Sequence, residues 1–413
     1  MFALLTMALR NLFRNKRRSI ITVLGISAGL ALCQTVYNLN SGNYNKMLDT
    51  GIRGTSGHVV VQHSQWLNDP EVEHTVGNST ALAEQLQAAN VGAIVTRRVF
   101  AGGLITSPTN AIAVGILGVD PEPESQLSRA AQRMVEGEWL KPDDRRGLVL
   151  GDTLAKRLGV GVKGRVVVMA PDPEDPTEST SVLFRVRGIY HSGVELLDNF
   201  SVMVSVPGAQ PLLKGEDPVH QVAVIYEDDS PTEVGLGKAK QIELGEDAVA
   251  LSWREALPDL QAFIKVDTQT NDIFFFILGF IVVLGVINTM LMSVLERVRE
   301  FGVMMAVGMR PKRLAVLVLM EGFLLGLASA ILGTALGTAL TYPLATSGLD
   351  FSEAMGETMM VEGVAMDAVL VAQYAPDRML LYAGAAISMT ILAAAWPAFR
   401  VSRMRPIQAI QHQ

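Results

Sequence analysis

The chain has 413 residues, of which 49% are hydrophobic, 18% charged and 6% aromatic, and its formal net charge is −7. Soluble domains carry about 25% charged residues, so the shortage of charge argues against a purely soluble enzyme and against a disordered protein. The acidic balance argues against nucleic acid as a partner. The single cysteine, Cys33, excludes an internal disulfide and a multi-cysteine zinc site.

Four segments nearly free of charge are long enough to cross a membrane, since a bilayer core needs about 20 apolar residues in a helix. They predict spans at 19–45, 273–295, 314–342 and 379–399. A cleaved signal peptide is the alternative for the first segment. Its apolar run is longer than a signal core, and Leu32 stands where cleavage before Cys33 needs a small residue.

Basic residues near the span ends predict the orientation. Residues 1–18, 296–313 and 400–413 together hold thirteen basic and two acidic residues. The other side, 46–272 and 343–378, holds 21 basic and 38 acidic residues. We therefore expect both termini and the loop at 296–313 to be cytoplasmic, and the long loop at 46–272 and the short loop at 343–378 to face outward.

The long loop between the first two spans mixes strand and helix patterns, which predicts an α+β domain large enough to bury its own core. The expected strands are 57–62, 111–116, 165–169, 182–189, 202–206 and 221–226. The expected helices are 80–89, 125–135, 152–158 and 231–244. Leu257, Leu260 and Ile264 recur at helical spacing, so the domain is expected to end in a stalk helix that continues into the second span, and 19–45 to include the start of another.

An acidic, proline-rich stretch, Pro171–Ser181, lies between two expected strands. Its three prolines, Pro171, Pro173 and Pro176, predict a protruding loop outside the sheet. This loop is a candidate contact for a partner.

Motifs for catalysis are absent from the sequence. Gly159, Gly161 and Gly164 form an isolated GxGxxG, but a helix is expected before it and a strand after it, the reverse of a dinucleotide site, so a tight turn is expected. No lysine is followed by serine or threonine, which excludes a Walker-type ATP site, and no histidines have HExxH spacing. We expect no catalytic residue, no metal and no cofactor in this chain.

The loop between the second and third spans predicts a short helix at 299–307. Gly308 fits the left-handed residue that ends it, and Pro311 fits the first turn of the next helix. Phe301 and Met305 lie four residues apart, with Met304 beside them. One interpretation is a helix resting on lipid headgroups; the other is adaptable side chains presented to a cytoplasmic partner.

This loop resembles the signature of the FtsX/MacB-like family of ABC transporter permeases. The matching residues are Glu296-Arg297, Glu300-Phe301-Gly302, Ala306-Val307-Gly308, Arg310, Arg313 and Glu321-Gly322. The basic opening 8–18, the outer-domain segments 136–138 and 147–160 and the end 396–410 resemble the same family. The length, the span order and the lack of a fused ATPase domain are most similar to the lipoprotein-releasing LolC/LolE branch.

The resemblance implies a four-span α-helical membrane protein of the bacterial inner membrane, with a large α+β periplasmic domain between spans one and two. It further implies a dimer with a second copy or a paralogue, driven by two separate ATPase subunits that bind ATP and Mg. The loop would then hold a coupling helix, relaying ATP-driven motion through the stalks to the periplasmic domain. The residues that carry this role by resemblance are Glu300, Phe301, Met304, Met305 and Gly308.

One acid lies within the third span. Glu321 is either functional, as intramembrane acids often are, or reaches back to Arg310 or Arg313, the interpretation we favour. Small residues at spacings that suit close helix packing predict contacts within one subunit or across a dimer. They are Gly322, Gly326 and Ala330, then Ser329, Gly333 and Gly337, and in the first span Gly25 and Gly29.

The resulting hypothesis is a non-enzymatic permease subunit that moves or releases lipoproteins or envelope lipids. Its partners would be an ABC ATPase dimer, membrane lipid, and a periplasmic carrier, lipoprotein or adaptor. In the lipoprotein-releasing branch one permease recruits a carrier through a long loop, which the short, acidic stretch 171–181 does not match. The alternatives are a MacB-like efflux permease for small molecules or peptides, and a signalling permease that controls a cell-wall hydrolase.

Overall fold

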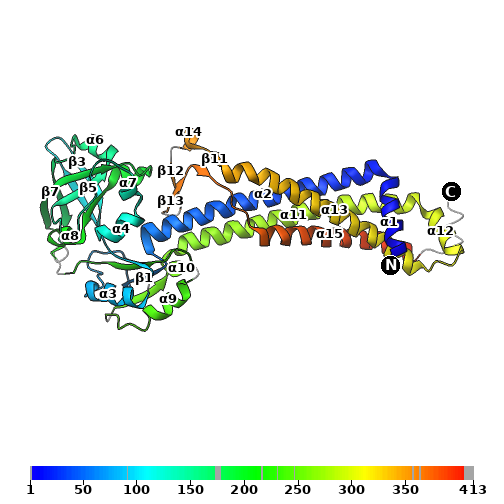
Figure 1. Cartoon of the computed structure of the whole chain (residues 1–413), viewed down its shortest axis with the longest axis horizontal. Coiled ribbons are helices and arrows are strands. Elements are labelled where there is room, and N and C mark those ends of the chain that lie inside the picture. Colours follow the sequence, from blue (N-terminus) through cyan, green and yellow to red (C-terminus); the bar gives the residue numbers. More distant parts are fainter. Residues whose placement is uncertain are drawn as a thin grey trace. The chain divides into compact units, whose positions relative to one another are not determined.

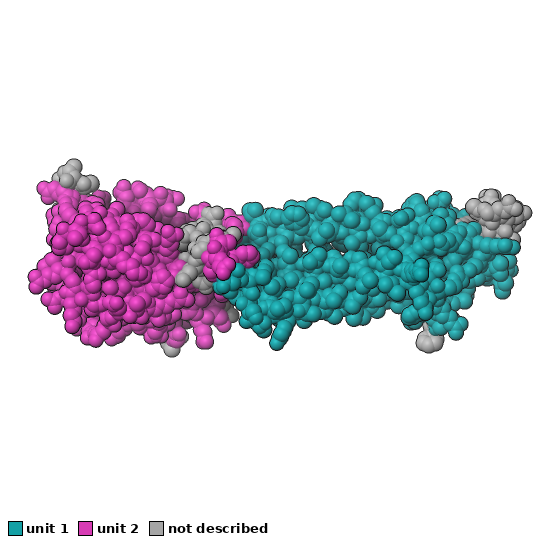
Figure 2. All heavy atoms as spheres, turned by 90° about the horizontal axis from the view of Figure 1, so that it is seen from above, with its two compact units in different colours: residues 1–45, 264–350, 369–413 teal, residues 46–263, 351–368 magenta. Residues whose placement is uncertain are grey.

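The computed structural model describes residues 2–90, 92–172, 178–214, 217–229, 231–245, 247–355, 358–361 and 364–403 (Figure 1). The chain forms two compact units, coloured in Figure 2. The membrane unit comprises residues 1–45, 264–350 and 369–413, and the outer unit comprises 46–263 and 351–368.

Four helices in the described part of the chain are long and apolar enough to cross a membrane. They are α2 (Lys16–Gly51), α11 (Pro258–Glu296), α13 (Pro311–Thr346) and α15 (Pro376–Ser402). Each exceeds the roughly 20 residues that a bilayer requires. The predicted four-span class is confirmed, and a single helix, α11, covers both the expected stalk after Pro258 and the second span.

The membrane unit is held together by apolar side chains between these helices, which lie alongside one another in Figure 1. Val286 and Met290 of α11, Val318 of α13 and Ala394 of α15 are all buried in one cluster. The shorter elements of this unit are α1 (Phe2–Arg14), α12 (Val298–Ala306), and the paired strands β11 (Leu349–Asp350) and β14 (Val369–Leu370).

The outer unit is built on one mixed sheet of ten strands among its described residues, in the order β10-β1-β9-β2-β3-β8-β5-β7-β4, with β6 paired to β2 and β7. Most neighbours are antiparallel, whereas β3–β8 and β5–β7 are parallel. The strands are β1 (Val59–His63), β2 (Ile94–Thr106), β3 (Ala111–Val119), β4 (Met134–Gly137), β5 (Gly147–Gly151), β6 (Arg165–Pro171), β7 (Ser179–Tyr190), β8 (Ser201–Ser205), β9 (Gln221–Ile225) and β10 (Ala248–Ser252).

Helices cover this sheet and bury its core, in which Leu86, Leu154, Phe184 and Leu212 are at most 1% exposed. The helices of the outer unit are η1 (Ile52–Ser56, a π-helical turn), α3 (Ser79–Ala89), α4 (Pro121–Leu127), α5 (Arg129–Gln132), α6 (Asp152–Leu158), α7 (Glu195–Phe200), α8 (Val206–Leu213), α9 (Thr232–Ala239), α10 (Trp253–Ala256) and α14 (Ser352–Met355), the last of which lies beside β12 rather than on this sheet. A hairpin, β12 (Thr358–Val361) and β13 (Val364–Asp367), also belongs to this unit.

Two predicted helices of the outer unit differ from the structure in their extent. The helix expected over 125–135 is interrupted at Ser128, whose hydroxyl caps α5 by accepting the N–H of Ala130 at 3.2 Å, and the end of that segment forms β4 instead. The helix expected over 231–244 ends at Ala239.

The stretch 171–181 was predicted to lie outside the sheet, but part of it belongs to the sheet. Pro171 pairs with Ser179 and Ala170 with Thr180, because β6 and β7 continue into it. Pro173 and Pro176 lie outside the described residues. The isolated GxGxxG is the expected turn between α6 and β6: Gly159 ends α6 in the left-handed conformation, at φ +64°.

Candidate coupling site

The loop between α11 and α13 folds as its sequence predicts. Helix α12 runs from Val298 to Ala306, Gly308 takes a positive φ of +103°, which a residue with a side chain rarely adopts, and Pro311 opens α13. The N–H of Gly308 donates to the carbonyl of Met305 at 3.0 Å, which closes the last turn.

The aromatic and methionine side chains of α12 face inward rather than outward. Phe301 is 1% exposed and Met305 is 8% exposed, and both pack with Val294, Leu314 and Val318. The expectation that Phe301 and Met305 are presented to a partner or to lipid is therefore wrong in this structure. Val298, Phe301 and Met305 recur at helical spacing, and together they form the face of α12 that is buried in the core of the membrane unit.

The opposite face of α12 is the one that is open. Val303 is 53% exposed and Val307 is 84% exposed, and both are flanked by exposed basic residues, Arg299 and Arg310. We call Arg299 and Val303 of α12, together with Val307 and Arg310 in the turn that follows it, the α12 outer face. Glu300 and Gly308 are exposed too, whereas Met304 is half-buried. In the sequence, the recurrence of residues 299, 303 and 307 every four positions indicated this exposed face. The prediction relied instead on the larger side chains at 301 and 305.

A buried ion pair anchors α12 to the third span. Arg297, which precedes α12 and is 5% exposed, donates from Nη1 to Oε1 of Glu321 at 3.0 Å. Asn11 of α1 donates from Nδ2 to the same oxygen at 2.6 Å. Glu321 is thus held by Arg297, not by Arg310 or Arg313 as predicted. Its carboxylate joins α1, the end of α11 and α13 around one buried charge.

Two further ion pairs tie the basic N-terminal segment to the same region. Arg14 contacts Glu300 at 2.9 Å and Arg18 contacts Glu296 at 2.7 Å, and all four side chains are at least 30% exposed. Burial favours a higher pKa for Glu300, but hydrogen bonds from Arg14 and Arg297 and their charges outweigh it and lower that pKa. Exposed pairs of this kind contribute about 1 kcal/mol at most, so the buried Arg297–Glu321 pair is the main polar contact.

The predicted glycine contacts on the third span are present in this structure. A side-chain carbon at Gly322 would lie 2.5 Å from Cβ of Ala394, and one at Gly326 would meet Thr390, so this side packs on α15. Gly333 and Gly337 face α2 instead: a carbon there would meet Ser27 and Leu30, or Gln34.

Gly25 and Gly29 of the first span differ from these, because a carbon added to either meets no atom within 4 Å. They make no close contact with the described residues of this chain.

The packing of α13 on α15 gives a testable expectation. Gly326→Leu should lower the free energy of unfolding by about 1–3 kcal/mol, because the new side chain overlaps Thr390 and the backbone of Ile387. Gly285→Leu is the matched control, since that position on α11 has open space. Thermal unfolding of the purified protein in detergent measures both variants. Equal midpoints for the two would contradict the packing.

Three side chains in the outer unit have the spacing of metal ligands, although no metal was expected. Ligand atoms of Asp152, His191 and Asp198 lie within 4.8 Å of one another. The Asp198 carboxylate already accepts the N–H groups of Ser192 and Gly193, and Asp152 contacts Lys156 at 2.7 Å. Burial raises the pKa of Asp152, but hydrogen bonds from Lys156 and His191 outweigh this and bring the pKa to about 2. We assign these side chains to holding α6 and α7 together.

Two family models match segments that together cover most of the chain. Residues 19–235, which are 217 of the 413 residues, match the model of the MacB-like periplasmic core domain, and residues 273–406 match the FtsX-like permease C-terminal model. The chain belongs to the FtsX/MacB family of permeases. The outer unit therefore contains a MacB-like periplasmic domain, inserted between the first and second spans, and the chain is a membrane-spanning permease component of an ABC transporter of the LolC/LolE or MacB type.

Relatives of this FtsX/MacB permease include the lipoprotein-releasing system transmembrane protein LolC of Xylella fastidiosa, 21% identical over 96% of this chain and 94% of that protein. LolE of Haemophilus influenzae is 20% identical over 94% of this chain and 93% of that protein. The macrolide export ATP-binding/permease protein MacB of Neisseria gonorrhoeae is 23% identical over 81% of this chain and 52% of that protein, so the chain spans about half of its length.

Among solved structures, the periplasmic region of MacB from Actinobacillus actinomycetemcomitans matches with a TM-score of 0.37 and 14% identity, over 55% of this chain and 98% of that one.

The α12 outer face and the Arg297–Glu321 pair both lie within the segment that matches the FtsX-like permease model.

Proposed function

We propose that this permease couples ATP hydrolysis by a separate ATPase dimer, which binds ATP and Mg, to motion of its periplasmic domain, and that it releases lipoproteins or envelope lipids from the inner membrane. The observation that carries the coupling role is the α12 outer face. It combines two exposed valines with flanking arginines, on α12 and the turn after it, and a buried ion pair fixes this helix. An apolar centre with a charged rim is the anatomy of a protein interface.

The lipoprotein branch is supported by the matches to LolC and LolE, which cover 94% and 93% of those proteins. A MacB-like efflux role is the second candidate, because the match to the MacB-like periplasmic core domain covers more than half of the chain. A second permease copy or paralogue, and a periplasmic carrier or adaptor, complete the proposed assembly.

The coupling role is tested by placing a charge on the α12 outer face. Val307→Asp should reduce association with the ATPase at least tenfold, about 1.4 kcal/mol, because the carboxylate must leave water in an apolar contact. Copurification of the ATPase with the full chain, and ATP hydrolysis by the complex, are the measurements. Val135→Asp, at a valine 60% exposed in the periplasmic domain, is the control. Undiminished association of the Val307→Asp protein would refute the docking site.

The proposed orientation, with both termini cytoplasmic, has its own test. In a Cys33→Ala background, cysteines introduced at the exposed positions Ser179 and Arg310 report the two sides. Ser179→Cys should react with a membrane-impermeant maleimide in spheroplasts, and Arg310→Cys only after permeabilisation. Reaction of both in intact spheroplasts would overturn the arrangement.

A further inference from the structure

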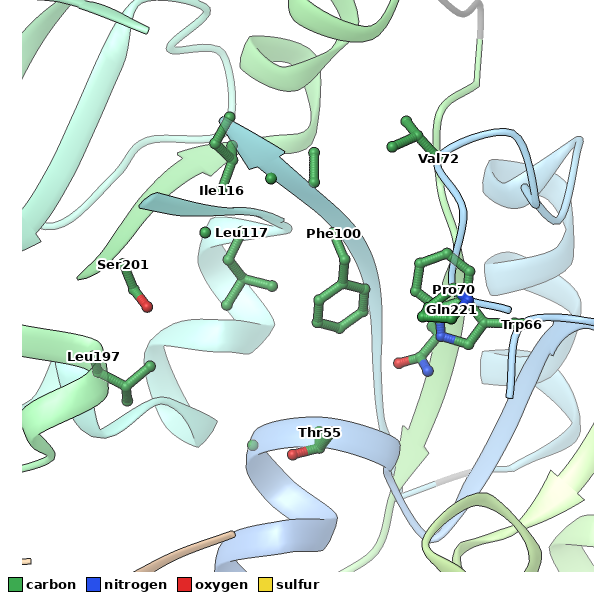
Figure 3. A pocket seen from close by; sticks show the side chains of 14 residues that line it. Thr55, Trp66, Pro70, Val72, Phe100, Ile116, Leu117, Leu197, Ser201 and Gln221 are labelled. Atoms are coloured by element: carbon green, nitrogen blue, oxygen red, sulfur yellow. The ribbon is translucent and has the colours of Figure 1, made fainter. Parts of the chain in front are cut away.

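A pocket of about 540 Å³ lies in the periplasmic domain, among η1, β2, β3 and β9, and no contact described above uses it (Figure 3). Figure 3 shows Phe100 between Leu117 and Leu197 on one side and Trp66 and Gln221 on the other. The volume is within the range of small-molecule sites. None of the lining residues is ionisable, so the pocket suits an uncharged, apolar group.

Trp66 and Phe100 form an aromatic wall of this pocket, and His220 holds both in place. The ring of Trp66 lies 4.5 Å from that of His220 and 5.9 Å from that of Phe100, centroid to centroid. Nδ1 of His220 accepts the N–H of Phe100 at 3.0 Å, and Nε2 therefore donates to the carbonyl of Val72 at 3.0 Å. Burial lowers the pKa of His220 to about 4, so the ring is neutral at neutral pH. The wall is thus pre-formed.

Glycines keep the pocket open. Gly102 of β2 pairs directly with Gly115 of β3, although glycine weakens a strand interior. A carbon added at Gly102 or at Gly54 meets no atom within 4 Å, and one at Gly115 meets only the carbonyl oxygen of Phe200, at 3.9 Å. The first carbon of a side chain at these positions therefore has open space, and a longer side chain would extend into the pocket that these glycines line.

Two polar side chains that line the pocket, Gln221 and Trp66, already have a partner within the protein. The Gln221 amide, oriented to satisfy its neighbours, donates to the carbonyl of Thr55 at 3.0 Å and accepts the indole N–H of Trp66 at 3.3 Å. At the glycine pair, β2 and β3 bond to each other, so this wall is no free sheet edge for a peptide strand. A peptide backbone would bring N–H and C=O groups that find few partners here, whereas an alkyl chain brings none.

We propose that this pocket binds one fatty acyl chain, with the polar head of the amphiphile left in solvent at the mouth. The assignment rests on the proposed function and deepens it, because it gives the periplasmic domain direct contact with the apolar part of a lipidated cargo. Each methylene that leaves water for the apolar lining favours binding of the chain. Lipoproteins and phospholipids both carry such chains, and the experiment distinguishes them.

The test uses the full chain in lipid nanodiscs, without ATPase or nucleotide. A diazirine-bearing palmitoyl chain is supplied in one arm on a synthetic lipopeptide and in the other on phosphatidylethanolamine. After illumination, mass spectrometry locates the label. We expect labelled peptides to contain Phe100, Leu117 or Leu197. Label there in either arm supports the acyl site and identifies its source; label in neither arm, or only outside the pocket, overturns it.

Filling the pocket provides the specificity control. Gly102→Leu, and independently Gly115→Leu, should reduce labelling of the pocket at least tenfold while the protein keeps its circular dichroism and elution volume. Gly237→Leu is the matched variant, since that exposed glycine of α9 also has open space and does not line the pocket. Unchanged labelling in a folded Gly102→Leu or Gly115→Leu protein would overturn the site. Because no ATPase is present, failure here leaves the coupling proposal standing, and failure of Val307→Asp leaves this one standing.

Discussion

Replacing Glu321 by leucine is expected to lower the free energy of unfolding of the permease by about 3 kcal/mol or more. The change removes the carboxylate that pairs with Arg297, a side chain 5% exposed, and leaves a buried positive charge with its weaker partner Glu300 at 3.3 Å. Breaking a buried pair from one side costs about 3–5 kcal/mol, whereas removing both charges is often neutral. The double variant Arg297→Met/Glu321→Leu should therefore recover most of the loss.

Equilibrium unfolding in detergent measures both proteins, and Arg14→Met is the matched control. Arg14 and Glu300 form a half-exposed pair in the same region, so that variant should lose about 1 kcal/mol at most. A Glu321→Leu protein as stable as the parent, or a double variant no better than the single one, would show that the Arg297–Glu321 pair does not hold α12 to α13.

The spans and much of the periplasmic sheet were predictable because their signals are local. The valine-rich segments that became β1 and β9 are each covered on both faces, and their apolar runs express that directly. The glycine and proline that end α12 and begin α13 act through their own backbone preferences. Such signals do not depend on which distant element packs against them.

The strand β2 was missed for the opposite reason. Arg97, Arg98, Gly102 and Gly103 interrupt any alternation of apolar residues along it. The structure accommodates them through distant partners: Arg98, fully buried, pairs with Glu124 at 3.1 Å, and Gly103 lies against the backbone of Met169 on β6. No local sequence pattern predicts a buried arginine whose ion-pair partner is 26 residues away.

The position of helix α12 was predicted, but not which of its faces is buried. The spacing of residues 298–307 defines two faces of a helix, and only the packing of α11 and α13 decides which face is buried. The same packing brings Arg297 to Glu321, 24 residues along the chain, although Arg310 and Arg313 are nearer in sequence. Tertiary contacts therefore decide both the buried face of α12 and the partner of Glu321. The sequence of the loop alone predicts neither.

A proline in the interior of α11 is expected to stop cargo release while sparing the ATPase. This helix runs unbroken from Pro258 to Glu296, and its residues belong to both units. If motion of the periplasmic domain depends on a rigid α11, Lys265→Pro should interrupt it. The proline removes the backbone N–H that bonds within the helix and clashes with the preceding turn, which costs about 3 kcal/mol or more. Leu260, in the first turn, is a poorer position for this change, since its N–H has no intrahelical acceptor there.

Lys265 suits this test because its side chain is exposed, so Lys265→Ala removes the same side chain and keeps the helix. Release of a lipidated cargo from proteoliposomes and ATP hydrolysis by the same preparation are measured in parallel. The alanine variant should retain both activities. The proline variant should keep bound ATPase and ATP turnover, because α12 lies at the other end of α11, and should lose release at least tenfold. Normal release by a Lys265→Pro protein would mean that α11 is a passive tether, and that coupling reaches the periplasmic domain by another element.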